Sequence, residues 1–590
     1  MTKNSMPFYI KEKERFQKEL QYLKKTLFKI SILRLAIFLA TFVGIYFFIP
    51  NGYAVAIIAV VGLSIFVFLL VKNAKLQTEK EILVSKIKIN STEIAVLQGD
   101  FKHLKTGSEF IDPHHFYSND IDLFGQGSFF QYSNRTATEE GALAYAAVLT
   151  ENSIYQIEEK QKALVELAKK VQWRQHFSAI AGLVTVQFSS KFIINQIKNY
   201  KTVFPQFTSG FVKGFSLISV ALSVLITVGI LPFATLVIWF FIGLFISASQ
   251  QKKTNAIYSV SGNAKESFKQ YYRLLEEIEK QTFTSKSLIY KQQKIQSEKE
   301  KASVVFQKFS RILDAFDQRN NIVIAVVGNA LFLWDIQNAV KVEKWIKKYK
   351  HTAESWIEVI TFFDVQNTLA NFYFNHPTFI LPSISEKGGL INAVQLGHPL
   401  LNARKRIDND FVIDKGQFFI ITGANMAGKS TFLRTVSLTI VMANMGLPVC
   451  AKSMEYTPIK LITSMRTSDS LANDESYFYS ELKRLKFIVD QIAIEDYFII
   501  LDEILKGTNS KDKAIGSKKF VEKLSQSNAT GIIATHDVSL CVMEESFKEI
   551  KNYFFDAQIN EDELHFDYAL KKGICKNMNA SFLLKKMEII

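Results

Sequence analysis

Residues 418–431 read FFIITGANMAGKST, an apolar run followed by a glycine-containing loop. The next residues, 432–443, contain no Pro or Gly and can form a helix. Glycines let the backbone N–H groups of such a loop turn inward around phosphate oxygens, and the following helix presents its N-terminus to the same anion. Lys429 can reach the β- and γ-phosphates, and the Ser430 hydroxyl can ligate Mg²⁺. The alternative is a chance match on a glycine-containing turn. The predicted nucleotide-binding residues are Gly423, Ala424, Asn425, Met426, Ala427, Gly428, Lys429, Ser430 and Thr431.

Two later apolar runs also end in polar residues. Residues 497–501 read YFIIL, as in a buried parallel strand, and lead into Asp502 and Glu503. Asp502 can hold Mg²⁺ directly or through water, and Glu503 can orient or deprotonate the attacking water. A third run, GIIAT at 531–535, is followed directly by His536, which can form a hydrogen bond with the γ-phosphate. The alternative for Asp502 and Glu503 is an acidic strand end without a functional role. The alternative for His536 is a core histidine whose hydrogen bonds are satisfied within the protein. The sequence thus predicts ATP and Mg²⁺ as cofactors, Ser430 and Asp502 as metal ligands, and Glu503 and His536 as catalytic residues.

These motifs need a scaffold of alternating strands and helices. From about Ile391 to the end of the chain, short apolar strands, loops and helices alternate, which predicts an α/β nucleotide-binding domain of the P-loop type. At 590 residues the chain is long enough for several domains. The net charge of +15 favours anionic partners such as nucleic acid or a lipid surface. Three scattered cysteines indicate a reducing compartment and no disulfide framework.

Long uncharged segments appear twice in the first half of the chain. Leu35–Val71 carries no charge and is broken at Pro50-Asn51-Gly52, so each half is about as long as the roughly 20 residues that a membrane span needs. This predicts a transmembrane hairpin with spans Ser31–Ile49 and Tyr53–Val71. Gly214–Ser249 repeats the pattern with a break at Leu231-Pro232. Four buried core helices are the alternative, although these segments lack any polar face.

Basic residues flank both hairpins, and the loops between the spans hold no Lys or Arg. By the positive-inside rule, both termini and all large segments lie in the cytoplasm, which predicts a multi-pass protein of the inner (cytoplasmic) membrane. A third apolar run, Ile322–Trp334, is too short to span and contains Gly328 and Asn329. We expect this run to be buried in the protein core.

The fold prediction is a multidomain chain, with a mostly α-helical core, two transmembrane helical hairpins and a C-terminal α/β P-loop ATPase domain. The expected divisions are a cytoplasmic N-terminal helix (1–30), hairpin 1 (31–72), the first part of the helical core (73–213), hairpin 2 (214–250), a second helical part or lever (251–390) and the ATPase domain (391–590).

Several motifs resemble one known family, the MutS mismatch-repair ATPases. ITGANMAGKST is similar to their usual TGPNMGGKST, DEILKGT at 502–508 to DEIGRGT, and ATH at 534–536 to their ATH. Residues 468–481 resemble the family's signature loop, and GHPLL at 397–401 its HP element. The resemblance is specific over about 390–590, and it implies that the predicted P-loop ATPase domain is of ABC/MutS type. It is weaker over 76–200 and 254–390, where Asn134-Arg135-Thr136, Gly141 and residues 161–167 resemble the helical core domain.

This resemblance implies a homodimer with composite sites, in which Ser476 of one subunit faces the nucleotide of the other. ATP binding would close the dimer as a clamp, hydrolysis would reopen it, and DNA would be a partner. Asp474 and Glu475 stand where the family usually has Gly-Arg, which places acidic groups near the partner's nucleotide. The first membrane hairpin takes the place of the family's mismatch-reading domain, so we expect DNA binding without standard mismatch reading. The lysines of Lys265–Phe309 either grip DNA or form a solvated face.

Two other functions share some of these features. An ABC-type ATPase coupled to membrane transport has the same loop, acidic strand end and histidine, but an LSGGQ-like signature is missing before Tyr497. A membrane tether could use ATP only as a structural ligand. The complete set of Lys429, Ser430, Asp502 and Glu503 argues against the tether. The favoured prediction is a membrane-anchored MutS-like ATP hydrolase.

Overall fold

The structure is a computed structural model of the chain. It describes residues 5–183, 190–262, 264–296, 300–385, 389–424, 426–466, 477–527, 529–560 and 563–575. Helices make up most of the described residues up to Asn375, and strands appear from β1 (Ser383–Ile384) onward. The predicted order of a mostly helical part followed by a C-terminal α/β part is therefore confirmed.

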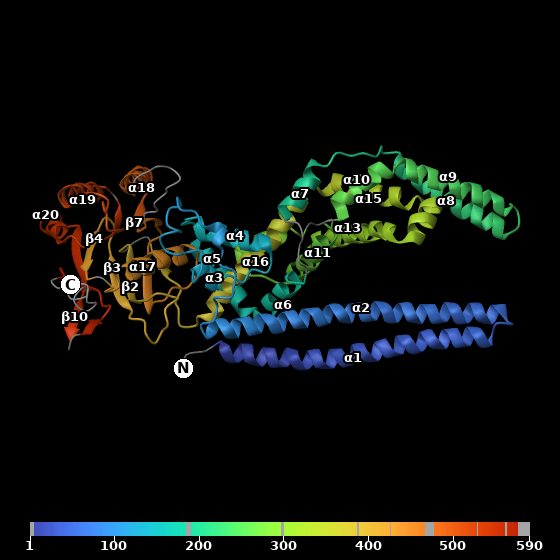
Figure 1. Ribbon diagram of the computed structural model, residues 1–590, viewed down its shortest axis with the longest axis horizontal. Helices are drawn as coiled ribbons and strands as arrows, with labels where there is room; N and C mark the ends of the chain where they lie inside the picture. The colour runs from blue at the N-terminus through green and yellow to red at the C-terminus, as the bar shows by residue number, and fades with distance from the viewer. Residues whose placement is uncertain are drawn as a thin grey trace.

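Two long antiparallel helices open the chain and form one arm of the molecule (Figure 1). They are α1 (Met6–Phe47) and α2 (Gly52–Leu97), and the turn between them falls at the predicted Pro50-Asn51-Gly52 break. The Asn51 side chain caps α2 by accepting a hydrogen bond from the Ala54 N–H at 3.2 Å. The expected separate N-terminal helix and first span are one continuous helix, because no residue between Met6 and Phe47 interrupts the backbone hydrogen bonds.

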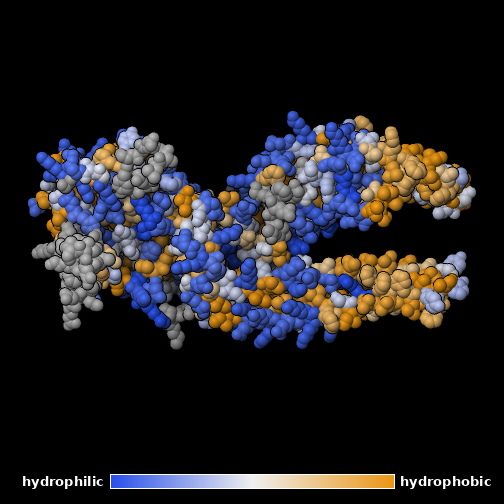
Figure 2. All heavy atoms as spheres, viewed as in Figure 1, coloured by the Kyte–Doolittle hydropathy of each residue, from blue (hydrophilic) through white to orange (hydrophobic). Residues whose placement is uncertain are grey.

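A second arm carries the other uncharged segment, in α8 (Thr208–Thr227) and α9 (Phe233–Ser249). Figure 2 shows hydrophobic residues covering the far ends of both arms, which project from the same side of the molecule. By length and composition α1, α2 and α8 can each cross a membrane, and α9 with the bent continuation up to Ser259 is a fourth candidate. One planar membrane could therefore hold both hairpins.

Shorter helices connect the arms and pack around a largely aromatic core. Phe268, Phe306, Phe309 and Trp345 lie at its centre, and the rings of Phe309 and Trp345 stack at 3.8 Å. The helices other than α1, α2, α8 and α9 are α3 (Phe129–Ser133), α4 (Glu139–Thr150), α5 (Ile157–Lys169), α6 (Val171–Ala181), α7 (Ser190–Asn199), α10 (Gln251–Gly262), α11 (Lys265–Glu279), α12 (Lys286–Gln293), α13 (Ala302–Asp317), α14 (Asn329–Phe332), α15 (Trp334–Tyr349) and α16 (Ala353–Asn375), with short helical turns η1 (Ser108–Phe110), η2 (Gln318–Asn320) and η3 (Ile324–Gly328). Of these, α10, α13 and α15 lie in the second arm with α8 and α9 (Figure 1).

The third apolar run corrects one prediction. Ile322–Trp334 forms the connection between α13 and α15, and its first residues are on the surface rather than in the core. Ile322 is 78% exposed and Val323 59% exposed, while Ala330 and Leu333 are fully buried. The prediction was wrong for the exposed half because the run lies at the end of a helical hairpin, where a core can cover only one side.

The C-terminal part contains a six-stranded sheet in the order β12-β9-β4-β8-β7-β6. All neighbouring strands from β9 to β6 pair in parallel, and β12 adds an antiparallel edge. The central strands are continuous apolar runs buried on both faces, as parallel sheets require. The strands are β4 (Phe418–Gly423), β6 (Lys460–Ser464), β7 (Tyr497–Asp502), β8 (Thr530–Ala534), β9 (Ile550–Phe555) and β12 (Lys571–Lys572).

A smaller sheet, β1-β5-β2-β3, and the hairpin β10-β11 complete this part. Apolar side chains of α4, α5 and α16 share one core with α17 and the strands, so the helical and α/β parts pack together without a break. The remaining elements are β2 (Ile391–Leu396), β3 (Asn409–Ile413), α17 (Lys429–Asn444), β5 (Ser453–Tyr456), α18 (Tyr477–Ile492), α19 (Ser510–Ser525), η5 (Val538–Val542), α20 (Met543–Ser546), β10 (Ala557–Asn560) and β11 (Glu563–Phe566).

Candidate nucleotide-binding site

The glycine-containing loop joins the buried strand β4 to the buried helix α17. Gly428 has a φ of +105°, a backbone conformation that favours glycine, and it turns the loop directly into the first turn of α17. A Cβ atom at Gly428 would lie 3.0 Å from the Tyr568 ring, so the C-terminal segment closes over this position. The loop thus meets a helix N-terminus at the carboxyl end of the parallel sheet, which is where ligands bind in open α/β folds.

Lys429 is buried and points back into the loop. Its Nζ donates hydrogen bonds to the carbonyl oxygens of Gly423 at 2.6 Å and Ala424 at 3.1 Å. The same Nζ lies 3.4 Å from His536 Nε2. Burial lowers the pKa of the ammonium, and the nearby Asp502 and Glu503 carboxylates oppose this shift. A cation is therefore fixed at the centre of the loop.

Ser430 and Asp502 come together from α17 and the end of β7. The Ser430 hydroxyl donates a hydrogen bond to Asp502 Oδ2 at 2.9 Å, although 72 residues separate them. A hydroxyl and a carboxylate are hard oxygen donors, and Mg²⁺ commonly uses only one or two protein ligands beside water and phosphate oxygens. The pair therefore fits the predicted metal ligands.

Glu503 and His536 form a second pair beside the first. Glu503 Oε1 lies 3.0 Å from His536 Nε2, and Lys506 Nζ lies 3.9 Å from Oε2. The hydrogen bond with His536 lowers the pKa of Glu503 to about 2, against the opposing effect of burial. Glu503 has a φ of +51°, and its N–H donates to the Ala534 carbonyl at 2.8 Å. A non-glycine residue held in this region is strained, which is common at functional sites.

Glu481 is a site residue that the sequence reasoning did not assign. It lies on α18, is 3% exposed, and accepts hydrogen bonds from the backbone N–H groups of Leu505 and Lys506. These residues lie two and three positions after Glu503, so Glu481 fixes the chain beyond the acidic end of β7. Burial raises the pKa of the Glu481 carboxyl. Its position in the signature-like segment was the available signal, but only the fold reveals its acceptors.

The structure brings most of the predicted residues to one place. Gly423, Ala424, Ala427, Gly428, Lys429 and Ser430 surround the end of β4, and Asp502, Glu503 and His536 approach them from β7 and from the segment after β8. Thr431 lies in the first turn of α17, and the Met426 side chain is 74% exposed. Asn425, Ser476, Asp474 and Glu475 lie outside the described residues.

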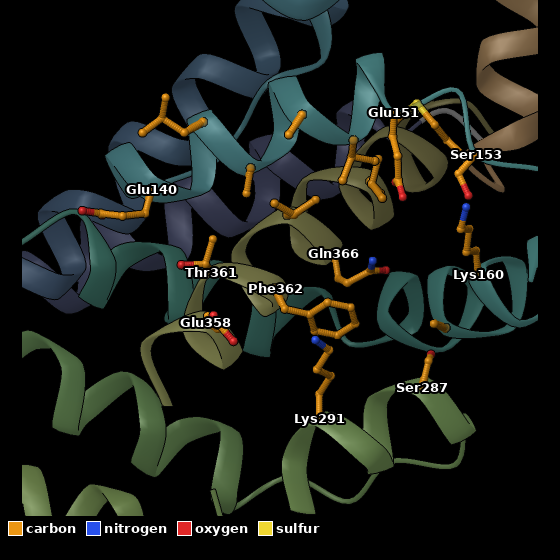
Figure 3. Close-up of a pocket in the computed structure, with 18 of the residues that line it drawn as sticks. Glu140, Glu151, Ser153, Lys160, Ser287, Lys291, Glu358, Thr361, Phe362 and Gln366 are labelled. Atoms are coloured by element: carbon orange, nitrogen blue, oxygen red, sulfur yellow. The ribbon is translucent and has the colours of Figure 1, made fainter. Parts of the chain in front are cut away.

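A separate cavity of about 1120 Å³ lies between the helical part and α17. None of the predicted site residues that the structure describes lines this cavity. Figure 3 shows Lys160, Lys291, Glu151 and Glu358 around it, and Lys291 Nζ lies 5.0 Å from the centre of the Phe362 ring. Because both charge signs line this space, its residues do not indicate one class of ligand.

Comparison with known proteins shows which family the C-terminal part of the chain resembles. The family description MutS domain V matches residues 419–586, which contain the loop, Asp502, Glu503 and His536. Together with the curated relatives below, this match makes the chain a MutS-like family member, with the likeness carried by its C-terminal part.

The relatives carry MutS names and match this chain at modest identity. The chain is 31% identical over 203 residues to the protein "MutS protein homolog 4" from Homo sapiens, covering 32% of this chain and 21% of that protein. It is 27% identical over 270 residues to "DNA mismatch repair protein MutS" from Staphylococcus haemolyticus and 28% over 271 residues to that from Staphylococcus aureus, covering 44% of this chain and 30% of each relative. The chain thus spans less than a third of the length of these relatives.

Proposed function

We propose that this protein is a Mg²⁺-dependent ATP hydrolase that is anchored in a membrane. The observation that carries the proposal is the convergence of Lys429, the Ser430–Asp502 pair and the Glu503–His536 pair around one loop. A fixed cation, a pair of oxygen donors and an ionised carboxylate are the groups that phosphoryl transfer to water requires. The membership in a MutS-like family supports the same activity.

Each group has a separate role in this proposal. The loop N–H groups and the α17 N-terminus bind the phosphates, and the Lys429 ammonium exchanges its carbonyl partners for β- and γ-phosphate oxygens. Ser430 and Asp502 hold Mg²⁺, which would supply further positive charge against those oxygens. Glu503 accepts a hydrogen bond from the attacking water and orients it, and His536 contacts the γ-phosphate.

The experiment is ATP turnover by the purified full chain and by Lys429→Ala. The substitution removes the charge that faces the phosphates, so we expect turnover and nucleotide affinity to fall below detection or by several orders of magnitude. Lys452→Ala is the matched control, because Lys452 is an exposed lysine of the same α/β part. Turnover of Lys429→Ala at the rate of the parent protein would exclude the assigned loop.

The membrane part of the proposal rests on the two arms. Their far ends are hydrophobic on the outside as well as the inside, with Phe42, Val60, Leu217 and Phe241 each more than half exposed. Exposure of such an apolar surface to water is unfavourable, whereas lipid acyl chains can surround it without this cost. Basic residues follow on the body side of both arms, so we place both termini and the ATP site in the cytoplasm, with the spans in the inner membrane.

A homodimeric clamp that binds DNA is the further part of the proposal, and it rests on the family. In a dimer Ser476 of one subunit would face the nucleotide of the other. The net charge of +15 supports an anionic partner. Several lysines of the Lys265–Phe309 segment instead pair with carboxylates, as Lys265 does with Asp314 and Asp317. Titration of DNA binding with salt, over matched, mismatched and branched duplexes, tests this part, and salt-independent binding would argue against phosphate contacts.

A further inference from the structure

The connection between α13 and α15 is an apolar surface that neither the ATP site nor the four spans account for. Residues 322–334 read IVIAVVGNALFLW and contain no charged side chain. They form the π-helical turn η3 and the short α14, and Ile322, Val323, Val326 and Val327 are each more than 40% exposed. A contiguous exposed apolar patch of this kind marks a site of contact with a partner or a membrane.

The neighbours of this connection fix its depth along the second arm. At Gly243 of α9 a Cβ atom would overlap the carbonyl oxygen of Ala330, so the two backbones touch and only glycine fits. Ser216 of α8 donates a hydrogen bond to the Phe332 carbonyl at 3.4 Å. Gly243 and Ser216 both belong to the uncharged run Gly214–Ser249. The connection therefore lies beside the part of the hairpin that enters the membrane, past the exposed Lys213.

We propose that Ile322–Phe332 is a re-entrant membrane segment whose partner is the acyl-chain region of the cytoplasmic leaflet. The inference rests on the proposed anchoring of α8 and α9. A run of this length is too short to span, and it enters and leaves on one side, as α13 and α15 both return to the body of the molecule. The lever-like helical hairpin would then end in the membrane itself.

Polar groups within the segment are arranged as a lipid environment demands. The Asn329 side chain donates to the Ala325 carbonyl at 3.0 Å and accepts from the Asp335 N–H at 2.9 Å. The Trp334 indole N–H donates to the Ala315 carbonyl at 2.8 Å. These groups find partners inside the chain, so only aliphatic and aromatic surface faces outward. The charged pair Arg319–Asp335, 3.0 Å apart, lies just outside the apolar run.

The test is depth-dependent quenching of a fluorophore on Val323→Cys in the full chain reconstituted into vesicles. The three native cysteines are buried, and the labelled parent protein gives their background. Val60→Cys on α2 reports a proposed span, and Lys347→Cys on α15 reports the aqueous side of the same helical hairpin. Quenchers are lipids with a nitroxide high on the acyl chain, and iodide in the water.

We expect Val323→Cys to be quenched by the lipid nitroxide to an extent comparable to Val60→Cys and to be protected from iodide, with the reverse at Lys347→Cys. Quenching of Val323→Cys by iodide alone, while Val60→Cys responds to lipid, would contradict the re-entrant segment and leave the anchoring intact. Protection from both quenchers would show a protein cover, such as a second copy of the chain, and would also contradict it. If Val60→Cys also responded only to iodide, the proposed anchoring itself would fail.

Discussion

His536 contacts two groups with different tasks, the Lys429 ammonium at 3.4 Å and the Glu503 carboxylate at 3.0 Å. Through these contacts one side chain connects the phosphate-binding loop with the residue proposed to act on water. The hydrogen bond with His536 holds Glu503 in its ionised form, since it lowers the pKa of Glu503 to about 2. At neutral pH the carboxylate can accept a hydrogen bond from water but has little capacity to keep a proton.

Glu503→Gln separates ATP binding from ATP hydrolysis. The amide keeps the size of the side chain but loses the negative charge, so we expect ATP binding to persist and hydrolysis to slow by roughly 10²–10⁴-fold. Single-turnover hydrolysis and equilibrium nucleotide binding, measured on the same preparation, check this. Asp512→Asn, at an exposed position on α19, is the control. Normal hydrolysis by Glu503→Gln would remove Glu503 from the role of acting on water.

Glu481 acts as a positioning residue in this account. Glu481→Ala removes the acceptor of two backbone N–H groups, the buried one of Leu505 and the partly buried one of Lys506, and leaving the buried donor unpaired costs about 1–3 kcal/mol. We expect the chain after Glu503 to shift, so that turnover falls while nucleotide affinity changes little. Glu481→Gln still offers one acceptor oxygen and should recover part of the turnover, whereas Glu545→Ala at an exposed position should change nothing. Equal losses of affinity and turnover in Glu481→Ala would point to a general structural role instead.

At the scale of elements, a buried polar network joins the first hairpin to α16. Glu93 of α2 is 2% exposed and accepts hydrogen bonds from Arg135 at 2.6 Å, Asn371 at 3.0 Å and Asn375 at 2.7 Å. The Tyr9 hydroxyl of α1 donates to Asn375 at 2.7 Å. The base of the hairpin is thereby fixed to the helix that leads into the α/β part.

Arg135→Met tests this junction. The substitution leaves the Glu93 carboxylate buried without its cation, which typically costs about 3–5 kcal/mol. We expect a lower unfolding temperature of the detergent-purified protein, and partial recovery when Glu93→Gln is added, because the two residues share one interaction. Lys486→Met is the control, since Lys486 pairs with Asp490 within α18, both side chains are more than half exposed, and such a pair is worth less than about 1 kcal/mol. Equal effects of Arg135→Met and Lys486→Met would argue against the network.

Local patterns predicted the elements that local chemistry determines. The breaks at Pro50 and Pro232, the apolar strands β4, β7 and β8, and the position of the loop before α17 could all be read from neighbouring residues. Contacts between segments that are distant in the sequence could not be predicted in this way. The pairing of Glu93 with Asn371 spans 278 residues, and no periodicity encodes it. The exposure of Ile322 likewise depends on where α13 and α15 end relative to α9, which hydropathy alone does not specify.

At the scale of the whole molecule, the proposed ATP site and the hydrophobic ends of the arms lie at opposite ends (Figure 1, Figure 2). Movement at the loop would therefore have to pass through α17, the shared core and α16 to reach the membrane. The continuous apolar packing between the helical and α/β parts offers a rigid connection for such a movement. Our central claim is thus that this MutS-like protein, with its proposed ATP site, is an integral membrane protein.

Extraction of cell membranes with alkaline carbonate tests this claim most directly. The variants place acidic residues on lipid-facing positions of hairpin 1 (Phe42→Asp with Val61→Asp), of hairpin 2 (Val220→Asp with Phe241→Asp), or of both. A charged residue at the centre of a span costs about 2.5–3.5 kcal/mol on insertion scales. We predict that the parent chain and each single-hairpin variant stay in the carbonate-resistant fraction and that the combined variant is released. Release of the intact parent chain by carbonate would contradict the claim.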